Sequence, residues 1–364
     1  MRIIFLFALL IGCALTTAAQ TGRTSASCTQ ILKLAQTTYE QGRLHEVPKL
    51  LEACITRDQL SAEEKRDAFK LLTQAYIYLE EPKEADAHMI LLLQADPFFE
   101  VDEAVDPAEF ITLYRKFRTK PLFRVGAKGA VNATLPVFIS NFYVGGNGQG
   151  AGNYNAGVGF QGGLVFERDL FQQNKFRNNW KQRLVAAAEL MYFARRFTYE
   201  NNRILSSDIS DGNSGTLSAE VSQVWVDVSP LMQYRLGERF GTYVTFGPTL
   251  SRRLRVESIP TTTITPNGAT PSTLTGTVNQ TEAFANWVYS IQLGAGAKVR
   301  IGKFYVTGEV RYQHGLRNLI NSNNRSTPEA VFDFAFQNND IRQNNLAVNI
   351  GFLVPFFKPK KLIR

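Results

Sequence analysis

The sequence predicts a multi-domain α plus β chain: N-terminal α-helical hairpins followed by an eight-stranded antiparallel transmembrane β-barrel. Apolar residues recur with a helical period between residues 28 and 118, and with a period of two after residue 119. The alternating segments number eight, and one parity of each holds the apolar residues while the other holds charged and small residues. The 364 residues leave room for two domains of ordinary size.

The N-terminus predicts an export signal. The start "MRIIFLFALLIGCALTTAAQ" has one arginine, an apolar run and small residues near Ala19, so residues 1–19 are expected to be a cleaved signal peptide. The stretch "LIGC" also fits a lipobox, which would make Cys13 a lipid-bearing first residue. After Leu15 no apolar run is long enough for a membrane-spanning helix.

Charge divides the chain into an acidic and a basic part. Residues 28–118 carry 11 Lys and Arg against 17 Asp and Glu, whereas residues 119–364 carry 27 against 15. Basic patches bind nucleic acid in the cytosol. The export signal argues against a nucleic acid partner here, so none is expected.

Residues 28–118 form the predicted helical domain. Ser61 followed by Glu64 is a capping box, and Phe69, Leu72 and Tyr76 share one helical face. Two helix pairs can be overlaid with a period of about 40 residues, which resembles a degenerate tetratricopeptide-type (TPR-like) repeat. The resemblance implies a groove for a peptide or protein partner. An unrelated small helical bundle is the alternative.

The cysteines Cys28 and Cys54 predict a disulfide. If the chain turns near Gly42, the two lie nearly level on antiparallel helices, and an oxidising compartment favours their pairing. Two buried free thiols are the alternative. The chain has no Cys-x-x-Cys and only three histidines, so neither a metal site nor a cofactor is expected.

Residues 119–364 form the predicted barrel. In "NWVYSIQLGAGAKVRI", from Asn286, one parity is wholly apolar and the other is polar, charged or glycine, and successive strand residues face opposite sides of a sheet. The eight segments of this kind lie near residues 122–133, 155–167, 182–199, 218–237, 240–256, 284–301, 303–315 and 343–356.

The connections between these segments tend to alternate in length. Those near residues 134–154, 200–217, 257–283 and 316–342 are long and rich in Gly, Asn, Ser, Thr and Pro. Two others, at residues 237–239 and 302–303, are tight. Even strand number, alternation and unequal loops are together the signature of an outer-membrane barrel. A soluble β-sandwich is the alternative, but it does not explain why the charges occupy one parity.

The charges on the polar parity predict a filled lumen. In an eight-stranded barrel the interior is just wide enough for side chains, so these groups are expected to pair there and form a plug rather than a pore. The predicted lumen residues are Arg124, Lys128, Glu167, Glu189, Asp227, Arg235, Arg253, Lys298, Arg300, Glu309 and Arg311. "GAGAK" is not a phosphate-binding loop, because a strand follows it instead of a helix.

Residues 119–364 resemble the small outer-membrane β-barrel family of the OmpA/OmpX type, particularly the PorT-like barrels of Bacteroidota. The resemblance rests on the eight-strand pattern, the early "AAQ" and the terminal "NNLAVNIGFLVPFF". It implies folding by the barrel-assembly machinery, an outer-membrane location and both termini in the periplasm, with the helical domain there. It implies no catalytic motif.

The expected function is therefore non-enzymatic. The barrel, held in outer-membrane lipid, would anchor a periplasmic helical module that binds a periplasmic protein partner, as a scaffold or accessory in envelope assembly or secretion. One alternative is an outer-membrane lipid or peptide hydrolase with a rim active site at His314, with Ser322 and Ser326 in the following loop. A second alternative is adhesin-like surface recognition through the long outer loops.

Overall fold

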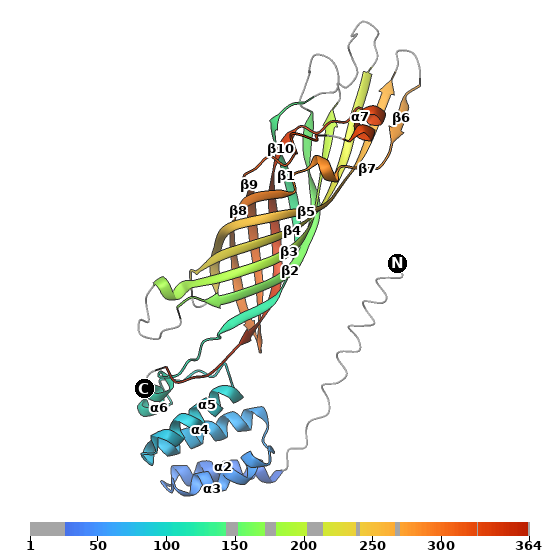
Figure 1. The fold of residues 1–364 in the computed structure, drawn as a ribbon. Coiled ribbons are helices and arrows are strands. Elements are labelled where there is room, and N and C mark those ends of the chain that lie inside the picture. The colour runs from blue at the N-terminus through green and yellow to red at the C-terminus, as the bar shows by residue number, and fades with distance from the viewer. Residues whose placement is uncertain are drawn as a thin grey trace. The chain divides into compact units, whose positions relative to one another are not determined.

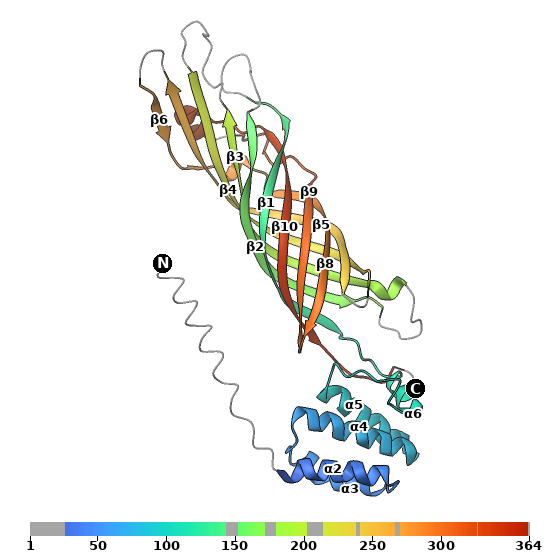
Figure 2. The ribbon, with the colours of Figure 1, turned by 180° about the vertical axis from the view of Figure 1, so that it is seen from behind.

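The computed structural model describes residues 26–142, 152–171, 180–201, 214–237, 241–265, 270–325 and 327–362. The chain divides into two compact units (Figures 1 and 2). The helical unit comprises the residues up to Lys120 together with those from Phe357 onward, and the barrel unit is Pro121–Phe356. The predicted signal peptide, residues 1–19, and Cys13 lie outside the described residues.

The helical unit contains five helices in its described part. These are α2 (Ala26–Glu40), α3 (Glu46–Thr56), α4 (Ala62–Tyr78), α5 (Pro82–Ala95) and α6 (Ala108–Tyr114). Helix α2 packs against α3 and α4, and α4 packs against α5. The apolar faces meet in one core that includes Leu51, Leu72, Met89 and Phe110. None of the described helices is long and apolar enough to cross a membrane.

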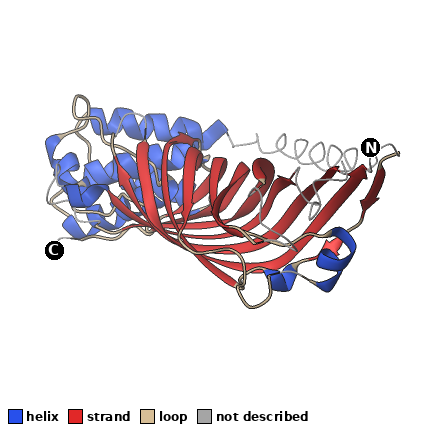
Figure 3. Cartoon of the chain, turned by 90° about the horizontal axis from the view of Figure 1, so that it is seen from above, coloured by secondary structure: helices blue, strands red, loops and turns tan. Residues whose placement is uncertain are grey.

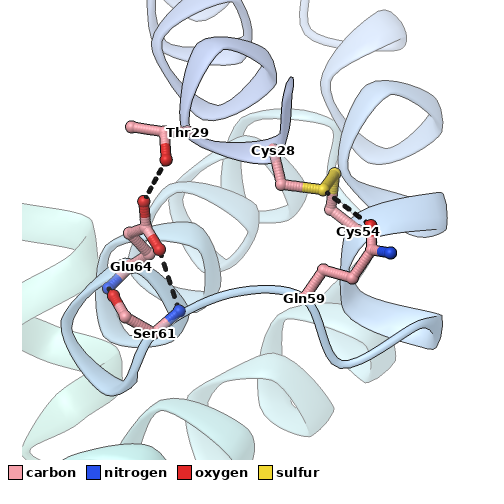
Figure 4. Close-up of a disulfide and its surroundings, with 6 residues drawn as sticks. All are labelled: Cys28, Thr29, Cys54, Gln59, Ser61 and Glu64. Carbon is pink, nitrogen blue, oxygen red and sulfur yellow. Dashed lines mark hydrogen bonds between the residues drawn. A yellow bond between two sulfur atoms is a disulfide. The ribbon is translucent and has the colours of Figure 1, made fainter. Parts of the chain in front are cut away.

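The start of α4 has the capping box that the sequence predicts. The Glu64 backbone N–H donates to Ser61 Oγ at 3.3 Å, and the Ser61 N–H donates to Glu64 Oε2 at 2.8 Å. The Thr29 hydroxyl of α2 donates to Glu64 Oε1 at 2.6 Å (Figure 4). Because these donors favour the carboxylate, with the Thr29 bond contributing most, the pKa of Glu64 is lowered from its ordinary value.

A disulfide joins Cys28 of α2 to Cys54 of α3, with their Cα atoms 5.8 Å apart (Figure 4). The turn between the two helices contains Gly42 at φ +79°, a conformation that glycine adopts without strain. Gln59 Oε1 lies 3.5 Å from Cys28 Sγ. The disulfide sulfur carries no proton, so this is a contact and not a hydrogen bond. Cross-links of this kind stabilise a domain by about 2–4 kcal/mol.

The Glu64 cap predicts an acid-sensitive helical unit. A carboxyl whose folded-state pKa is depressed contributes stability above its unfolded pKa and loses it as the pH falls through the folded value. We expect Glu64→Gln to cost about 1 kcal/mol at neutral pH and nothing at a pH where Glu64 is protonated. Urea unfolding followed by helical circular dichroism measures this. The adjacent Glu63→Gln is the control, and an equal effect of both variants would contradict the account.

The residues after the last strand return to the helical unit. Phe117 and Lys361 form an antiparallel bridge, and the Arg118 N–H donates to the Lys360 carbonyl at 3.0 Å. The Phe357 ring meets Phe98 edge-on at 5.0 Å, and Lys361 forms an ion pair with Asp86 of α5. The C-terminal residues from Phe357 onward therefore belong to the helical unit, where Lys361 pairs with Asp86.

Eight long antiparallel strands form the barrel unit: β1 (Phe123–Ser140), β2 (Asn153–Asp169), β3 (Leu184–Asn201), β4 (Ser214–Arg235), β5 (Thr242–Thr265), β8 (Trp287–Ile301), β9 (Phe304–Gly315) and β10 (Asp340–Phe356). Each pairs with the next, and β1 pairs with β10, so the ring closes. Figure 3 shows the curved sheet from above. The predicted antiparallel ring is confirmed.

The ring is apolar outside and polar inside. On β8, Ile291, Leu293 and Val299 are 51%, 62% and 56% exposed, whereas Ser290 and Gln292, the two neighbours of Ile291, are buried. The same alternation runs along β9, where Val310 and Tyr312 are exposed and Glu309 and Arg311 are buried. A soluble barrel reverses this polarity. The surface that faces outward is therefore suited to lipid.

Two of the predicted long connections, residues 257–283 and 316–342, contain regular structure. Strand β5 runs on to Thr265 and pairs with β6 (Ser272–Thr275) and β7 (Val278–Asn279), followed by the short 3-10 helix η3 (Thr281–Ala283). The other loop contains α7 (Pro328–Phe334). Threonine and isoleucine are β-branched and suit a strand, which explains the extension.

An apolar core fills the end of the ring where these two long connections lie. Trp225, Phe197 and Phe193 from the strands pack with Phe284 and Ile320 from the connecting segments. The strands thus continue past the polar interior into a region that packs like a soluble β-protein. We call this the long-loop end, and the opposite end, which has the tight turn at Gly302, the tight-turn end.

Candidate functional site: the charged interior of the barrel

A cluster of buried charges crosses the middle of the lumen. Lys128 Nζ of β1 lies 2.7 Å from Glu189 Oε1 of β3 and 3.0 Å from Glu309 Oε2 of β9. Arg311 donates to Glu189 Oε1 at 3.0 Å and to Glu309 Oε1 at 2.8 Å through Nε. The Tyr243 hydroxyl of β5 donates to Glu309 Oε2 at 3.1 Å. Side chains from four strands therefore meet at one point in the lumen.

The glycines of β8 leave space for this cluster. A Cβ at Gly294 would lie 2.7 Å from Glu309 Oε1. The narrow lumen of an eight-stranded barrel has room for long charged side chains only where a residue facing them lacks a side chain. Packing thus explains why glycines accompany the long charged residues in the sequence.

A second cluster lies towards the tight-turn end. Arg124 of β1 binds Asp169 of β2 through two hydrogen bonds of 3.1 and 3.0 Å, the bidentate geometry that guanidinium and carboxylate favour. Arg235 of β4 also pairs with Asp169. Glu167 pairs with Lys298 of β8 and accepts from Gln233 Nε2 at 3.1 Å.

A third cluster lies towards the long-loop end. Arg195 of β3 pairs with Asp227 of β4 at 2.7 Å, and its guanidinium lies over the Phe193 ring at 4.5 Å. Gln313 Nε2 donates to Asp227 Oδ2 at 3.2 Å and to Ser290 Oγ at 2.7 Å. This cluster borders the apolar core around Trp225.

The structure brings nine of the eleven predicted lumen residues into these clusters. They are Arg124, Lys128, Glu167, Glu189, Asp227, Arg235, Lys298, Glu309 and Arg311. The other two, Arg253 and Arg300, lie elsewhere. Arg300 has the inward parity but is exposed, since it is next to the last residue of β8.

Arg253 lies beside an irregularity in the sheet. The pairing of β4 with β5 slips where Val224 faces Arg255 and Trp225 faces Arg253. Past this bulge the inward parity of β5 reverses, and Val256 becomes buried. Arg253 donates to the Phe284 carbonyl and to Asn286 Oδ1, so it braces the connection before β8.

Sequence reasoning missed two members of the clusters, Asp169 and Arg195. Both have the inward parity of their strands, Asp169 two residues after Glu167 and Arg195 six residues after Glu189. The alternation of inward and outward residues along each strand could have identified both Asp169 and Arg195. The predicted strand ends at residue 167, before Asp169, and Arg195 lies beside a second arginine, Arg196, which faces outward and is exposed.

The rim histidine of the hydrolase alternative lies beside a tyrosine. His314 Nδ1 is 3.5 Å from the Tyr312 hydroxyl oxygen, and Tyr312 faces outward. Within the described residues no hydrogen bond joins His314 to Ser322, and Ser326 lies outside them. The described residues also hold no group of three or more His, Cys, Asp and Glu arranged to bind a metal ion.

Ion pairs that span the lumen are suited to holding the barrel closed and rigid. Each of the five buried carboxylates in the described lumen, at residues 167, 169, 189, 227 and 309, has a cationic partner. Burial of a charge is costly unless it is paired and hydrogen-bonded, and two of the pairs, Arg311 with Glu189 and Lys298 with Glu167, join strands on opposite sides of the ring. The interior therefore cross-braces strands that are distant in sequence.

Comparison with known proteins identifies the class. Residues 117–321 match the family model described as "Outer membrane protein beta-barrel domain", which covers more than half of the chain. The chain belongs to this family, and the family places it in a bacterial outer membrane. No curated protein matches the chain.

Several solved structures are similar to the chain at low identity. Neisserial surface protein A (NspA) is 11% identical over 64% of this chain and 97% of its own, with a TM-score of 0.27. OprG from Pseudomonas aeruginosa is 11% identical over 66% and 98%, with a TM-score of 0.33. Ail of Yersinia pestis is 11% identical over 64% and 99%, with a TM-score of 0.24. Scores this low support no inference about function.

Proposed function

We propose that this protein is a non-enzymatic outer-membrane anchor for a periplasmic helical module that binds another protein. Its role would be that of a scaffold or accessory in envelope assembly or secretion. The observation that carries the proposal is the filled lumen. With Lys128 and Arg311 held between Glu189 and Glu309, the barrel is suited to anchoring rather than to transport.

The orientation of the barrel in the membrane follows from the number of strands and the lengths of their connections. An even number of strands brings both ends of the barrel to one side, and in outer-membrane barrels the short turns are periplasmic and the long loops are external. The chain leaves the helical unit at Lys120 and returns to it at Phe357. The helical unit would therefore be periplasmic.

The helical unit has features of a protein-interaction module. Helices α2 and α4 contact each other while each packs with the helix that follows it, which is the stacking expected of TPR-like hairpins. Leu34 of α2 and Tyr78 of α4 are 51% and 46% exposed, large apolar side chains of the kind that interfaces bury. Residues 28–118 are acidic, which favours a partner with basic residues.

Site-specific photo-cross-linking tests the proposal. A photoreactive amino acid is placed in the full-length protein at Leu34, at Tyr78 or, as the matched control, at Phe332 of α7, which is 85% exposed in the barrel unit. We expect adducts with an envelope protein from Leu34 or Tyr78 and none from Phe332. Adducts from Phe332 alone would contradict the proposal and favour surface recognition by the long-loop end. Adducts from none of the three would also contradict it.

A further inference from the structure

Two arginines meet one tryptophan on the outside of the barrel at the long-loop end. The Arg252 guanidinium of β5 lies over the Trp287 ring of β8, 5.3 Å from its centroid. Arg317, two residues after β9, donates from Nη1 to the Trp287 carbonyl at 3.2 Å. Arg252 and Arg317 are both exposed, and Trp287 is 40% exposed. We call these three residues the Arg–Trp cluster.

The Arg–Trp cluster lies where the outward-facing surface changes from apolar to charged. Along β8 the outward residues Leu293, Ile291 and Tyr289 are 62%, 51% and 52% exposed, and Trp287 ends the row. Tryptophan and tyrosine concentrate at membrane interfaces, at the level of lipid headgroups. The two guanidiniums are therefore at headgroup depth, on the side of the membrane that the long loops occupy.

The cluster's positive charge has no carboxylate partner in the described part of the chain. Neither Arg252 nor Arg317 forms an ion pair there. Arg255, three residues further along β5, differs, because it pairs with Glu257. The Arg252 side chain makes no hydrogen bond in the described part of the chain and the Arg317 side chain uses one donor there, so most of the N–H donors of these two exposed guanidiniums have no described protein acceptor.

We propose that the Arg–Trp cluster binds the phosphate group of a phosphorylated glycolipid of the lipid A type in the outer leaflet. Guanidinium matches phosphate through paired N–H donors, and each arginine near an anionic membrane surface adds to affinity. The indole ring holds Arg252 in place and contacts the acyl boundary below it. This inference rests on the family's outer-membrane location and not on the protein-binding role of the helical unit.

Lipid binding by matched variants tests the proposal. The full-length protein, folded in phosphatidylcholine nanodiscs, is titrated with lipid A, with dephosphorylated lipid A and with phosphatidylglycerol, using native mass spectrometry as the readout. The variants are Arg252→Gln, Arg317→Gln, their combination and Arg255→Gln. The last removes the same unit of charge from the same strand, but from an arginine that Glu257 already neutralises. Heat-dependent gel mobility checks that each barrel is folded.

We expect lipid A to bind more tightly than its dephosphorylated form or phosphatidylglycerol. Arg252→Gln and Arg317→Gln are each expected to weaken lipid A binding by about fivefold and the double variant by about 25-fold, with Arg255→Gln near wild type. Equal binding of dephosphorylated lipid A would overturn the role of phosphate. Equal binding of phosphatidylglycerol would overturn the choice of glycolipid, and equal losses from Arg255→Gln would overturn the site.

Discussion

Glu189→Gln is expected to destabilise the folded barrel by about 3–5 kcal/mol, the usual cost of leaving buried charges without their partner. Glu189 is buried on β3 and pairs with both Lys128 and Arg311. Glutamine keeps the size of the side chain but removes its charge, so two buried cations share the single carboxylate of Glu309. Urea unfolding of the protein in lipid vesicles measures the loss.

Glu200→Gln is the matched control for this prediction. Glu200 lies on the same strand but is exposed, and its neutralisation should change stability by less than about 0.5 kcal/mol. Because Glu189→Gln could prevent folding altogether, the double variant Glu189→Gln, Lys128→Gln is the second measurement. Removing one cation with the carboxylate should recover part of the loss. Equal stability of the Glu189 and Glu200 variants would show that the lumen ion pairs do not brace the barrel.

Leu293→Arg is expected to destabilise the barrel by about 2–4 kcal/mol, the cost of an arginine on the lipid face near the bilayer midplane. Leu293 is 62% exposed near the middle of β8, between the aromatic Tyr289 at one end and Val299 towards the other. An exposed leucine in water would tolerate arginine with little change. The size of the loss in stability therefore distinguishes a lipid-facing surface from a water-exposed one. Urea unfolding in vesicles again provides the measurement.

Leu274→Arg provides the comparison for the lipid face. Leu274 of β6 belongs to the same sheet and is 51% exposed, but it lies in the extension at the long-loop end. We expect its replacement to change stability by less than about 0.5 kcal/mol. A loss at Leu274 as large as that at Leu293, or no loss at either, would contradict the assignment of the outer surface to lipid.

Alternation in the sequence predicts the ring and, away from strand ends and bulges, the side of the sheet that a residue faces. The period of two places Lys128, Glu189, Glu309 and Arg311 inside without any knowledge of their partners. It could not say which cation meets which carboxylate, because that depends on the closure of the ring. Lys128 and Glu309, for example, are 181 residues apart. Period-two reasoning also fails past a bulge, since the buried residues of β5 are odd-numbered up to Ser251 and even-numbered from Val256.

Composition was a poorer guide at the long-loop end. The run of Pro, Thr and Gly after residue 259 looks like an irregular loop, yet β5 continues through it to Thr265. Its inward face is covered by Phe334 of α7, whose carbonyl accepts a hydrogen bond from the Thr262 hydroxyl at 2.8 Å. Phe334 is 72 residues after Thr262 in the chain, so the residues near Thr262 could not predict this packing.

Quenching by brominated lipids along β8 tests the inside-out barrel most directly. Single cysteines at Ile291, Gln292, Leu293 and Lys298 are labelled with a small fluorophore in the Cys13→Ser variant, whose Cys28 and Cys54 are held in their disulfide. Labels at Ile291 and Leu293 should be quenched strongly, and labels at Gln292 and Lys298 weakly, because the latter two face the filled lumen. Equal quenching at all four positions, or quenching at none, would contradict a lipid-facing apolar surface around a charged interior.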